Sequence, residues 1–187
     1  MVQWDASGRE IRRGPSPRIY DLKITADGTK IVAVCTKQTL HVYDFLDWKN
    51  HKEYNMGSGL TGVFVSKDSR HAIVNTAARE VVMVDVEAGR VVQRYFGQVQ
   101  DHWVIRGCLG GTDEGFVVSG SEGEYSWLGY GKFVLTSLDS NVYVWQKDTG
   151  QLVETLEGHD GPVNCVAWNP VNPYIFASAG DDRTIRM

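Results

Sequence analysis

Residues 142–187 decide the fold, and they read VYVWQKDTGQLVETLEGHDGPVNCVAWNPVNPYIFASAGDDRTIRM. The stretch opens on a strand that ends at Trp145, followed by a turn at 148–150 and a second short strand. A Gly158-His159 pair comes next, then two more apolar strands and a tight, Asp-rich turn. Short apolar runs separated by turn residues predict antiparallel strands, so this stretch reads as one structural repeat of about four strands.

The end of the third strand of this unit can be found again along the chain. It falls at Trp4, Tyr43, Val84 and Trp145, and next at the position just after Met187. The spacings are 39, 41 and 61 residues, then 43. Together with the Gly-His pair and the strand-ending Trp, a period of about 40–45 residues resembles the WD40 repeat. The sequence therefore predicts an all-β, partial WD40 β-propeller of about four blades that does not close into a ring, and we expect it to be a fragment.

The 61-residue interval is longer than the period allows. Deleting residues 123–138 restores a tight turn between two strands and shortens the interval to 45. A loop in a turn can be lengthened at modest entropic cost, so one interpretation is a surface insertion. The other is a retained intron, because Gly-Glu-Tyr-Ser at 123–126 can be encoded with a splice-donor-like GTGAGT.

The composition excludes several classes of partner. A net charge of −4 and a pI near 5.7 leave no basic footprint for nucleic acid. No apolar run approaches the 18 or so residues that span a bilayer, and no signal peptide is recognised at the start. Cys35, Cys108 and Cys165 lie in apolar strands and are odd in number, which predicts unpaired core cysteines. We expect a cytoplasmic or nuclear location.

His159, Ser178 and Asp182 are the residue types of a nucleophilic triad. The resemblance to WD repeats implies a different role, a buried hydrogen-bond network that fixes the blade. A nucleophile also needs an exposed, strained turn, and no G-x-S-x-G motif occurs. We therefore expect a structural network and no catalytic residue.

The same spacing recurs one blade upstream when residues 123–138 are removed. Ser119, Asp139 and Trp145 then match Ser178, Asp182 and the position after Met187. This predicts a second structural network. The two blades before it have Lys37 and Ala78 at the turn-Asp position and lack the Gly-His pair, so we expect them to depend on apolar packing.

No metal or cofactor site is predicted. Zinc sites need closely spaced cysteines, and the nearest two here are 57 residues apart. The histidines are also far apart in the sequence, at His41, His51, His71, His102 and His159. The Gly-rich run 107–112 lacks the G-K-[ST] end of a phosphate-binding loop and is interpreted as a turn between strands.

Two further clusters invite a binding role. Arg9, Arg12, Arg13 and Arg18 form a basic run, which is either a solvated loop or a docking patch for an acidic partner. Trp127, Tyr130 and Phe133 within residues 123–138 would make an exposed apolar patch, which is more an aggregation hazard than a binding site.

Several segments resemble successive blades of one WD subfamily, the WD-repeat subunit of the GID/CTLH ubiquitin-ligase complex. They are RIYDLKITADGTKIVAV (18–34), LHVYDF (40–45), LTGVFVSKDSRHAIVN (60–75), WVIRGCLGG (103–111) and GHDGPVNCVAWNP (158–170). The resemblance implies a scaffold or adaptor that binds other ligase subunits or substrates in proteasome-dependent degradation. It does not locate the partner-binding residues.

Two alternatives stay open. The chain could be a WD adaptor of another intracellular assembly, in RNA processing, transcription or signalling. An enzyme with an active site at the propeller centre would need convergent titratable residues on the innermost strands. Because those strands read mainly Val, Ile, Leu, Cys and Ser, an enzyme is disfavoured.

Overall fold

Antiparallel sheets of consecutive strands form the described part of the chain. The computed structural model describes residues 1–14, 16–100, 103–127, 133–137 and 139–187. The first four-stranded sheet has the order β3 (Ile19–Ile24), β4 (Lys30–Cys35), β5 (Thr39–Asp44) and β6 (His51–Asn55). The second has β7 (Leu60–Val65), β8 (His71–Thr76), β9 (Glu80–Asp85) and β10 (Val91–Phe96). The third has β11 (Cys108–Gly110), β12 (Phe116–Gly120), β15 (Val142–Gln146) and β16 (Leu152–Leu156).

Three smaller sheets complete the described strands. A three-stranded sheet has the order β17 (Val163–Trp168), β18 (Phe176–Gly180) and β19 (Ile185–Arg186). Two-stranded sheets are formed by β1 (Val2–Trp4) with β2 (Glu10–Arg13), and by β13 (Glu124–Trp127) with β14 (Phe133–Ser137). The helices of the described part are two 3-10 turns, η1 (Thr36–Gln38) and η2 (Thr112–Glu114).

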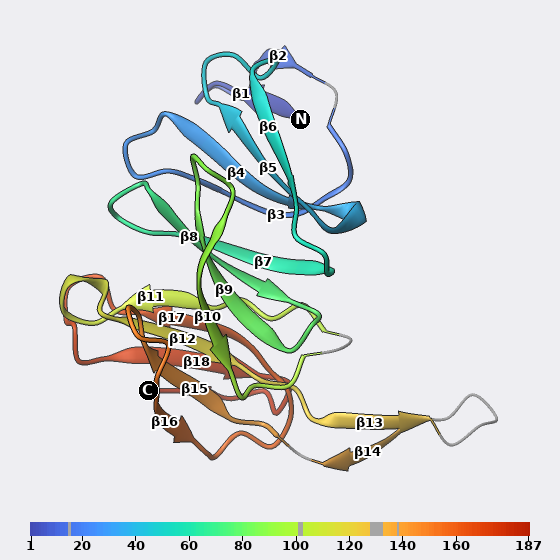
Figure 1. Ribbon diagram of the computed structural model, residues 1–187, viewed down its shortest axis with the longest axis vertical. Helices are drawn as coiled ribbons and strands as arrows, with labels where there is room; N and C mark the ends of the chain where they lie inside the picture. Colours follow the sequence, from blue (N-terminus) through green and yellow to red (C-terminus); the bar gives the residue numbers. More distant parts are fainter. Residues whose placement is uncertain (15, 101–102, 128–132, 138) are drawn as a thin grey trace.

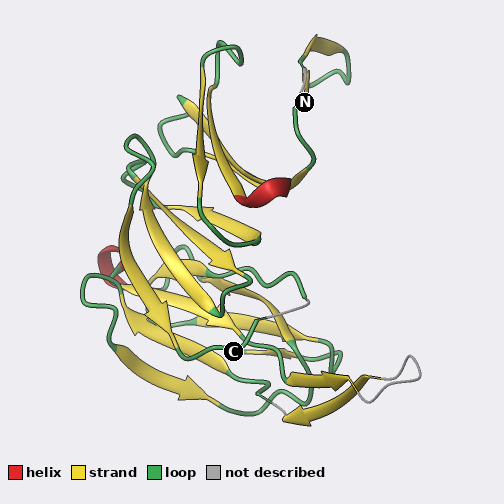
Figure 2. Ribbon diagram, turned by 45° about the vertical axis from the view of Figure 1, so that its right-hand side comes forward, coloured by secondary structure: helices red, strands yellow, loops and turns green. Residues whose placement is uncertain are grey.

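The sheets follow one another as the blades of an open arc (Figures 1 and 2). Each sheet is a meander in which every strand pairs antiparallel with the next one of its blade. The described blades do not close a ring. The predicted all-β, partial propeller is thereby confirmed.

The cores lie between blades, because β4, β8 and β12 of the three four-stranded sheets are buried on both faces. In β8, Val74 packs in a cluster with Val32 and Leu40 of the first sheet, whereas its neighbour Ile73 packs in a cluster with Trp145 of the third. Successive side chains of a strand point to opposite faces. A strand covered on both faces therefore reads as a continuous apolar run, which is the pattern of residues 31–34 in β4.

An Asp residue at the end of the third strand closes the next turn in the first two four-stranded blades. Asp44 Oδ1 accepts hydrogen bonds from the backbone N–H of Leu46 (2.8 Å) and Asp47 (3.1 Å). Asp85 Oδ1 accepts from the N–H of Glu87 and Ala88, both at 2.9 Å. A side chain that satisfies the turn amides favours the turn, which explains why Asp recurs at this position.

Gly110 lets two blades approach closely. A Cβ at this position would lie 2.1 Å from the ring of Trp168, which comes from β17 of the next sheet. Trp168 also stacks on Phe116, with ring centroids 6.1 Å apart. The glycine therefore provides the flat backbone surface on which the tryptophan rests.

Residues 123–138 contribute a hairpin of their own. The strands β13 and β14 pair only with each other and project from the side of the blades (Figure 1). The strands before and after this hairpin in the sequence, β12 and β15, pair directly with each other, with Ser119 opposite Tyr143 and Gly120 opposite Val142. The origin of this segment, surface insertion or retained intron, stays a prediction. The predicted aromatic patch of Trp127, Tyr130 and Phe133 lies outside the side chains that the structure describes.

The described helices are too short to cross a bilayer, and none of them is long and apolar enough to be a membrane span.

Candidate functional site

His159 lies at the centre of a polar network in the last blade. Its Nδ1 is 2.9 Å from Asp182 Oδ2, and its Nε2 is 2.8 Å from Ser178 Oγ. His159 comes from the loop before β17, Ser178 from the middle of β18, and Asp182 from the turn before β19. The structure thus brings together three residues that the sequence analysis had singled out.

Asp182 is held as a carboxylate. Burial raises its pKa, but hydrogen bonds from the backbone N–H of Thr184 and Asp160, with those of the His159 and Thr184 side chains, outweigh burial and lower the pKa below its ordinary value. Asp182 Oδ1 accepts from Thr184 N (3.0 Å), and Oδ2 accepts from Asp160 N (3.1 Å). The carboxylate therefore ties the loop before β17 to the turn before β19.

The same bonds would fit a Ser-His-Asp triad, but the position of the serine favours a structural role. Ser178 is 5% exposed and pairs on one side with Val166 of β17 and on the other with Arg186 of β19. A nucleophile must reach its substrate from an exposed turn. Buried polar groups, in contrast, need partners, which is what the His159 ring provides for Ser178.

The predicted second network does not form, and this corrects the sequence analysis. Ser119 Oγ accepts a hydrogen bond from Asn75 Nδ2 (2.9 Å) of the neighbouring sheet and donates its own hydrogen to Gly120 O (3.0 Å), so it has none to donate to Asp139. Asp139 Oδ2 instead accepts from Ser121 Oγ (2.8 Å) and Tyr143 OH (2.9 Å). In the last blade a short turn joins serine and aspartate, whereas here the β13–β14 hairpin separates them.

Trp145 packs where the spacing places it, at the end of a third strand, and two of its partners, Tyr95 and Phe96, come from the second sheet. The side chain is fully buried, its Nε1–H donates to Phe96 O (2.9 Å), and its ring packs against Tyr95 and Tyr143. It therefore joins two blades and is not a member of a histidine network.

At the positions of Lys37 and Ala78, no side chain takes the role that Asp182 has in the last blade. The polar clusters of these two blades lie in the turn before the second strand instead, where Asp27 bonds Thr25 and Thr29, and Asp68 bonds Ser66 and His71. Lys37 adopts a positive φ of 67° within η1. Ala78 donates its N–H to Thr76 Oγ1 at 3.3 Å. Apolar side chains of both sheets fill the interface between these blades, as expected.

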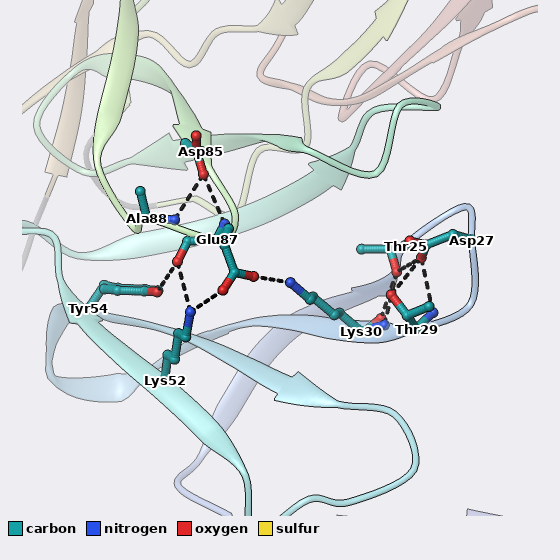
Figure 3. A network of polar contacts seen from close by, with 9 residues as sticks. All are labelled: Thr25, Asp27, Thr29, Lys30, Lys52, Tyr54, Asp85, Glu87 and Ala88. Atoms are coloured by element: carbon teal, nitrogen blue, oxygen red, sulfur yellow. Dashed lines mark hydrogen bonds and ion pairs between the residues drawn. The ribbon is translucent and has the colours of Figure 1, made fainter.

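A seam of charges joins these two blades at one rim (Figure 3), and the sequence analysis missed it. The Glu87 carboxylate pairs with the ammonium groups of Lys30 and Lys52. Its backbone oxygen accepts from Tyr54 OH (2.7 Å) and Lys52 Nζ (3.1 Å). Hydrogen bonds from Lys30 and Lys52 lower the pKa of Glu87 to about 2. The only sequence signal was the turn that contains Glu87.

Charged side chains also reach the innermost strands, which the sequence analysis had described as apolar. Arg106 Nε lies 3.2 Å from Asp21 Oδ2, although 85 residues separate them. Val63 N donates to the same Asp21 oxygen at 3.2 Å. This ion pair ties blades together and satisfies the carboxylate, so it does not supply a free acid or base.

The basic run near the N-terminus is distributed over separate contacts. Arg9 and Arg13 pair with Asp5 and Glu10 on the surface. Arg12 lies over the Trp48 ring, with 4.1 Å from its Cζ to the centroid. These contacts favour a solvated hairpin over a docking patch.

Two smaller expectations need correction. Cys35 and Cys108 are buried and free, and burial raises their pKa values to about 11 and 12, but Cys165 is exposed because its side of β17 faces away from the core. The Gly-rich run 107–112, interpreted as a turn, contains the strand β11.

One group of possible metal ligands escaped the sequence analysis. His41, His51 and Glu53 place a donor atom each within 4.8 Å of one another. They are ten and two residues apart in sequence, and only the pairing of β5 with β6 brings them together.

The comparisons with known proteins agree with this architecture. The family described as "WD domain, G-beta repeat" matches residues 150–187. The chain is similar along its whole length to "GID complex subunit 7" of Schizosaccharomyces pombe, at 34% identity, and to a "WD repeat-containing protein 26 homolog" of Arabidopsis thaliana, at 33%. It covers 35% and 30% of those two proteins. "Polycomb protein EED" of Chaetomium thermophilum is 51% identical, but over only 26% of this chain and 9% of its own length.

The blades and these matches define the chain as a WD40-repeat protein. It is related to the GID subunit 7 and WD repeat-containing protein 26 group, and it spans about a third of the length of those relatives.

Proposed function

We propose that this chain is a non-catalytic WD-repeat scaffold, a subunit of a GID/CTLH-type ubiquitin-ligase complex that acts in proteasome-dependent protein degradation. The observation that carries the proposal is the similarity to GID complex subunit 7 across all of this chain. The match to Polycomb protein EED covers about one repeat's length, as general WD similarity would. The partners would be other protein subunits or substrates, in the cytoplasm or the nucleus.

The architecture supports a scaffold. The blades are joined through their cores, by the Glu87 seam and by the Asp21–Arg106 pair, so the loops at both rims are presented on a stiff frame. Propellers expose loops for partners while their sheets stay packed. The Ser178 hydroxyl, which a hydrolase would need to expose, is buried and bound to His159.

Affinity purification of the tagged full-length gene product, followed by mass spectrometry, tests the proposal. We expect subunits of a GID/CTLH ligase to be recovered. Recovery of RNA-processing, transcription or signalling components in their place would support the alternative, an adaptor of another assembly. A bait in which the β17–β19 blade is deleted serves as a control for nonspecific capture.

A further inference from the structure

Three metal-binding side chains converge on one face of the β5–β6 hairpin. His41 of β5 lies directly opposite Glu53 of β6, and Tyr43 lies opposite His51. Alternate residues of a strand share a face, so His41 and Tyr43 stand on the same side as His51 and Glu53. The imidazole rings of His41 and His51 are nearly parallel, with centroids 5.8 Å apart, and His41 Nε2 is 3.9 Å from Glu53 Oε2.

The three side chains line a pocket of about 600 Å³. Arg12 and Arg13 of β2 also line it, so the N-terminal hairpin and the first four-stranded sheet both contribute to the pocket. His41 is buried, whereas His51 and Glu53 are exposed. The buried ring of His41 is held by its surroundings, whereas the exposed side chains of His51 and Glu53 can change their orientation.

A hydrogen-bond partner can orient the His41 ring toward a metal ion. Tyr43 OH lies 3.3 Å from His41 Nδ1 and can accept a hydrogen bond from the Nδ1–H, and in that tautomer Nε2 carries the lone pair for a ligand. A partner on the second nitrogen is the usual way that a ligating histidine is oriented.

Thr39 Oγ1 is the present neighbour of Nε2, at 3.0 Å. Its single hydrogen can be donated either to Nε2 or to Thr36 O, which is 3.1 Å away, so the hydroxyl keeps its bond to Thr36 O when Nε2 binds an ion. Tetrahedral ligands about 2.1 Å from an ion stand roughly 3.4 Å apart. The donor atoms lie within 4.8 Å of one another, so the exposed side chains of His51 and Glu53 would turn toward His41 to reach the separation that an ion requires.

We propose that His41, His51 and Glu53 bind one divalent transition-metal ion of the zinc class. Two imidazoles and one carboxylate are a donor set that zinc uses when a fourth position stays open. Imidazole nitrogen favours zinc and its neighbours over calcium or magnesium. The proposal is independent of the proposed role in a ligase.

The test is isothermal titration of the metal-free chain with Zn²⁺, and a parallel titration with Co²⁺ read by its visible absorption. We expect one ion per chain and a rise in melting temperature on addition of Zn²⁺. His51→Gln and Glu53→Gln should each weaken binding by tenfold or more, the scale expected when a ligand is lost. Glu154→Gln, an exposed carboxylate on β16, is the matched control and should bind as the parent does.

Because both positions are exposed, the two variants should fold, and circular dichroism of the metal-free proteins checks this. Absence of Zn²⁺ binding by the parent chain at 100 µM would overturn the proposal. Binding that survives both substitutions unchanged would overturn it equally, because the ion would then sit elsewhere.

Discussion

In the last sheet, the turn between β18 and β19 is held by Asp182, His159 and Ser178 through directed hydrogen bonds. In the second sheet, the corresponding turn between β8 and β9 contains Ala78, and the strand before it is held by close packing of valines. A hydrogen bond contributes about 1 kcal/mol net, whereas burying one large apolar side chain contributes about 1.5–3 kcal/mol. The comparison teaches that a blade can lose the polar network without losing its main source of stability.

The largest test of this comparison is Trp145→Ala in the third sheet. The ring is fully buried between two blades, so we expect a loss of about 3–5 kcal/mol in the free energy of unfolding, measured by urea denaturation. Trp4→Ala removes the same residue type at a predicted third-strand end, where the side chain is 57% exposed, and should lower the free energy of unfolding far less. Equal effects of the two would contradict the interblade core.

Leu40→Ala tests the apolar blades themselves. Leu40 is fully buried in the cluster between the first two sheets, and its truncation should cost about 2–5 kcal/mol in the same measurement. Leu46→Ala, at a site that is 83% exposed, is the control, and its effect on the free energy of unfolding should be near zero. If Leu40→Ala lowered the free energy of unfolding by less than Ser178→Ala does, apolar packing would not be the main source of stability of these blades.

Ser178→Ala removes one hydroxyl from the polar network. His159 loses its Nε2 partner in a buried position, so we expect about 1–3 kcal/mol of destabilisation. Ser58→Ala, in a turn between blades, serves as the control. A variant as stable as the parent would show that the network adds no stability, and a hydrolytic activity abolished by Ser178→Ala would support the catalytic interpretation.

The smallest expected effect is that of the Glu87 seam, and it depends on pH. The pKa of Glu87 is lowered to about 2, from an ordinary value of 4.5. Its contribution is therefore complete above about pH 4.5 and is lost as the pH falls toward 2. Because the pair is exposed, we expect at most ~1 kcal/mol. Glu87→Gln should lower the urea midpoint at pH 7 and have little effect near pH 2, and a difference that grows toward low pH would contradict this.

The sequence predicted the repeat well because its signals are local. The third-strand ends at Tyr43, Val84 and Trp145 are each the second-last residue of a strand, β5, β9 and β15, and the turn at 148–150 falls between the paired strands β15 and β16. Such turns depend on neighbouring residues only. His159, Ser178 and Asp182 were found for the same reason, because their spacing belongs to one repeat.

Contacts between blades could not be found in this way. The repeat spacing placed Ser119 in a network with Asp139, but the Ser119 hydroxyl accepts a hydrogen bond from Asn75 of the neighbouring sheet. Arg106 pairs with Asp21, which is 85 residues away in the sequence. Spacing within one repeat carries no information on such partners. Strand pairing also brought His51 and Glu53 close to His41. The register of β5 and β6 places side by side residues that the sequence separates by the connection between the two strands.

By itself, the sequence determined the kind of repeat and the all-β fold, and it singled out the three polar residues that the structure brings together in the last blade. The tertiary structure decided how blades are joined: which faces of β4, β8 and β12 meet, where Trp168 rests on Gly110, and which charges pair at the rim. The reason is physical. A strand and its turn are fixed by local backbone preferences and period-two patterning, whereas packing partners depend on the register and stacking of whole sheets.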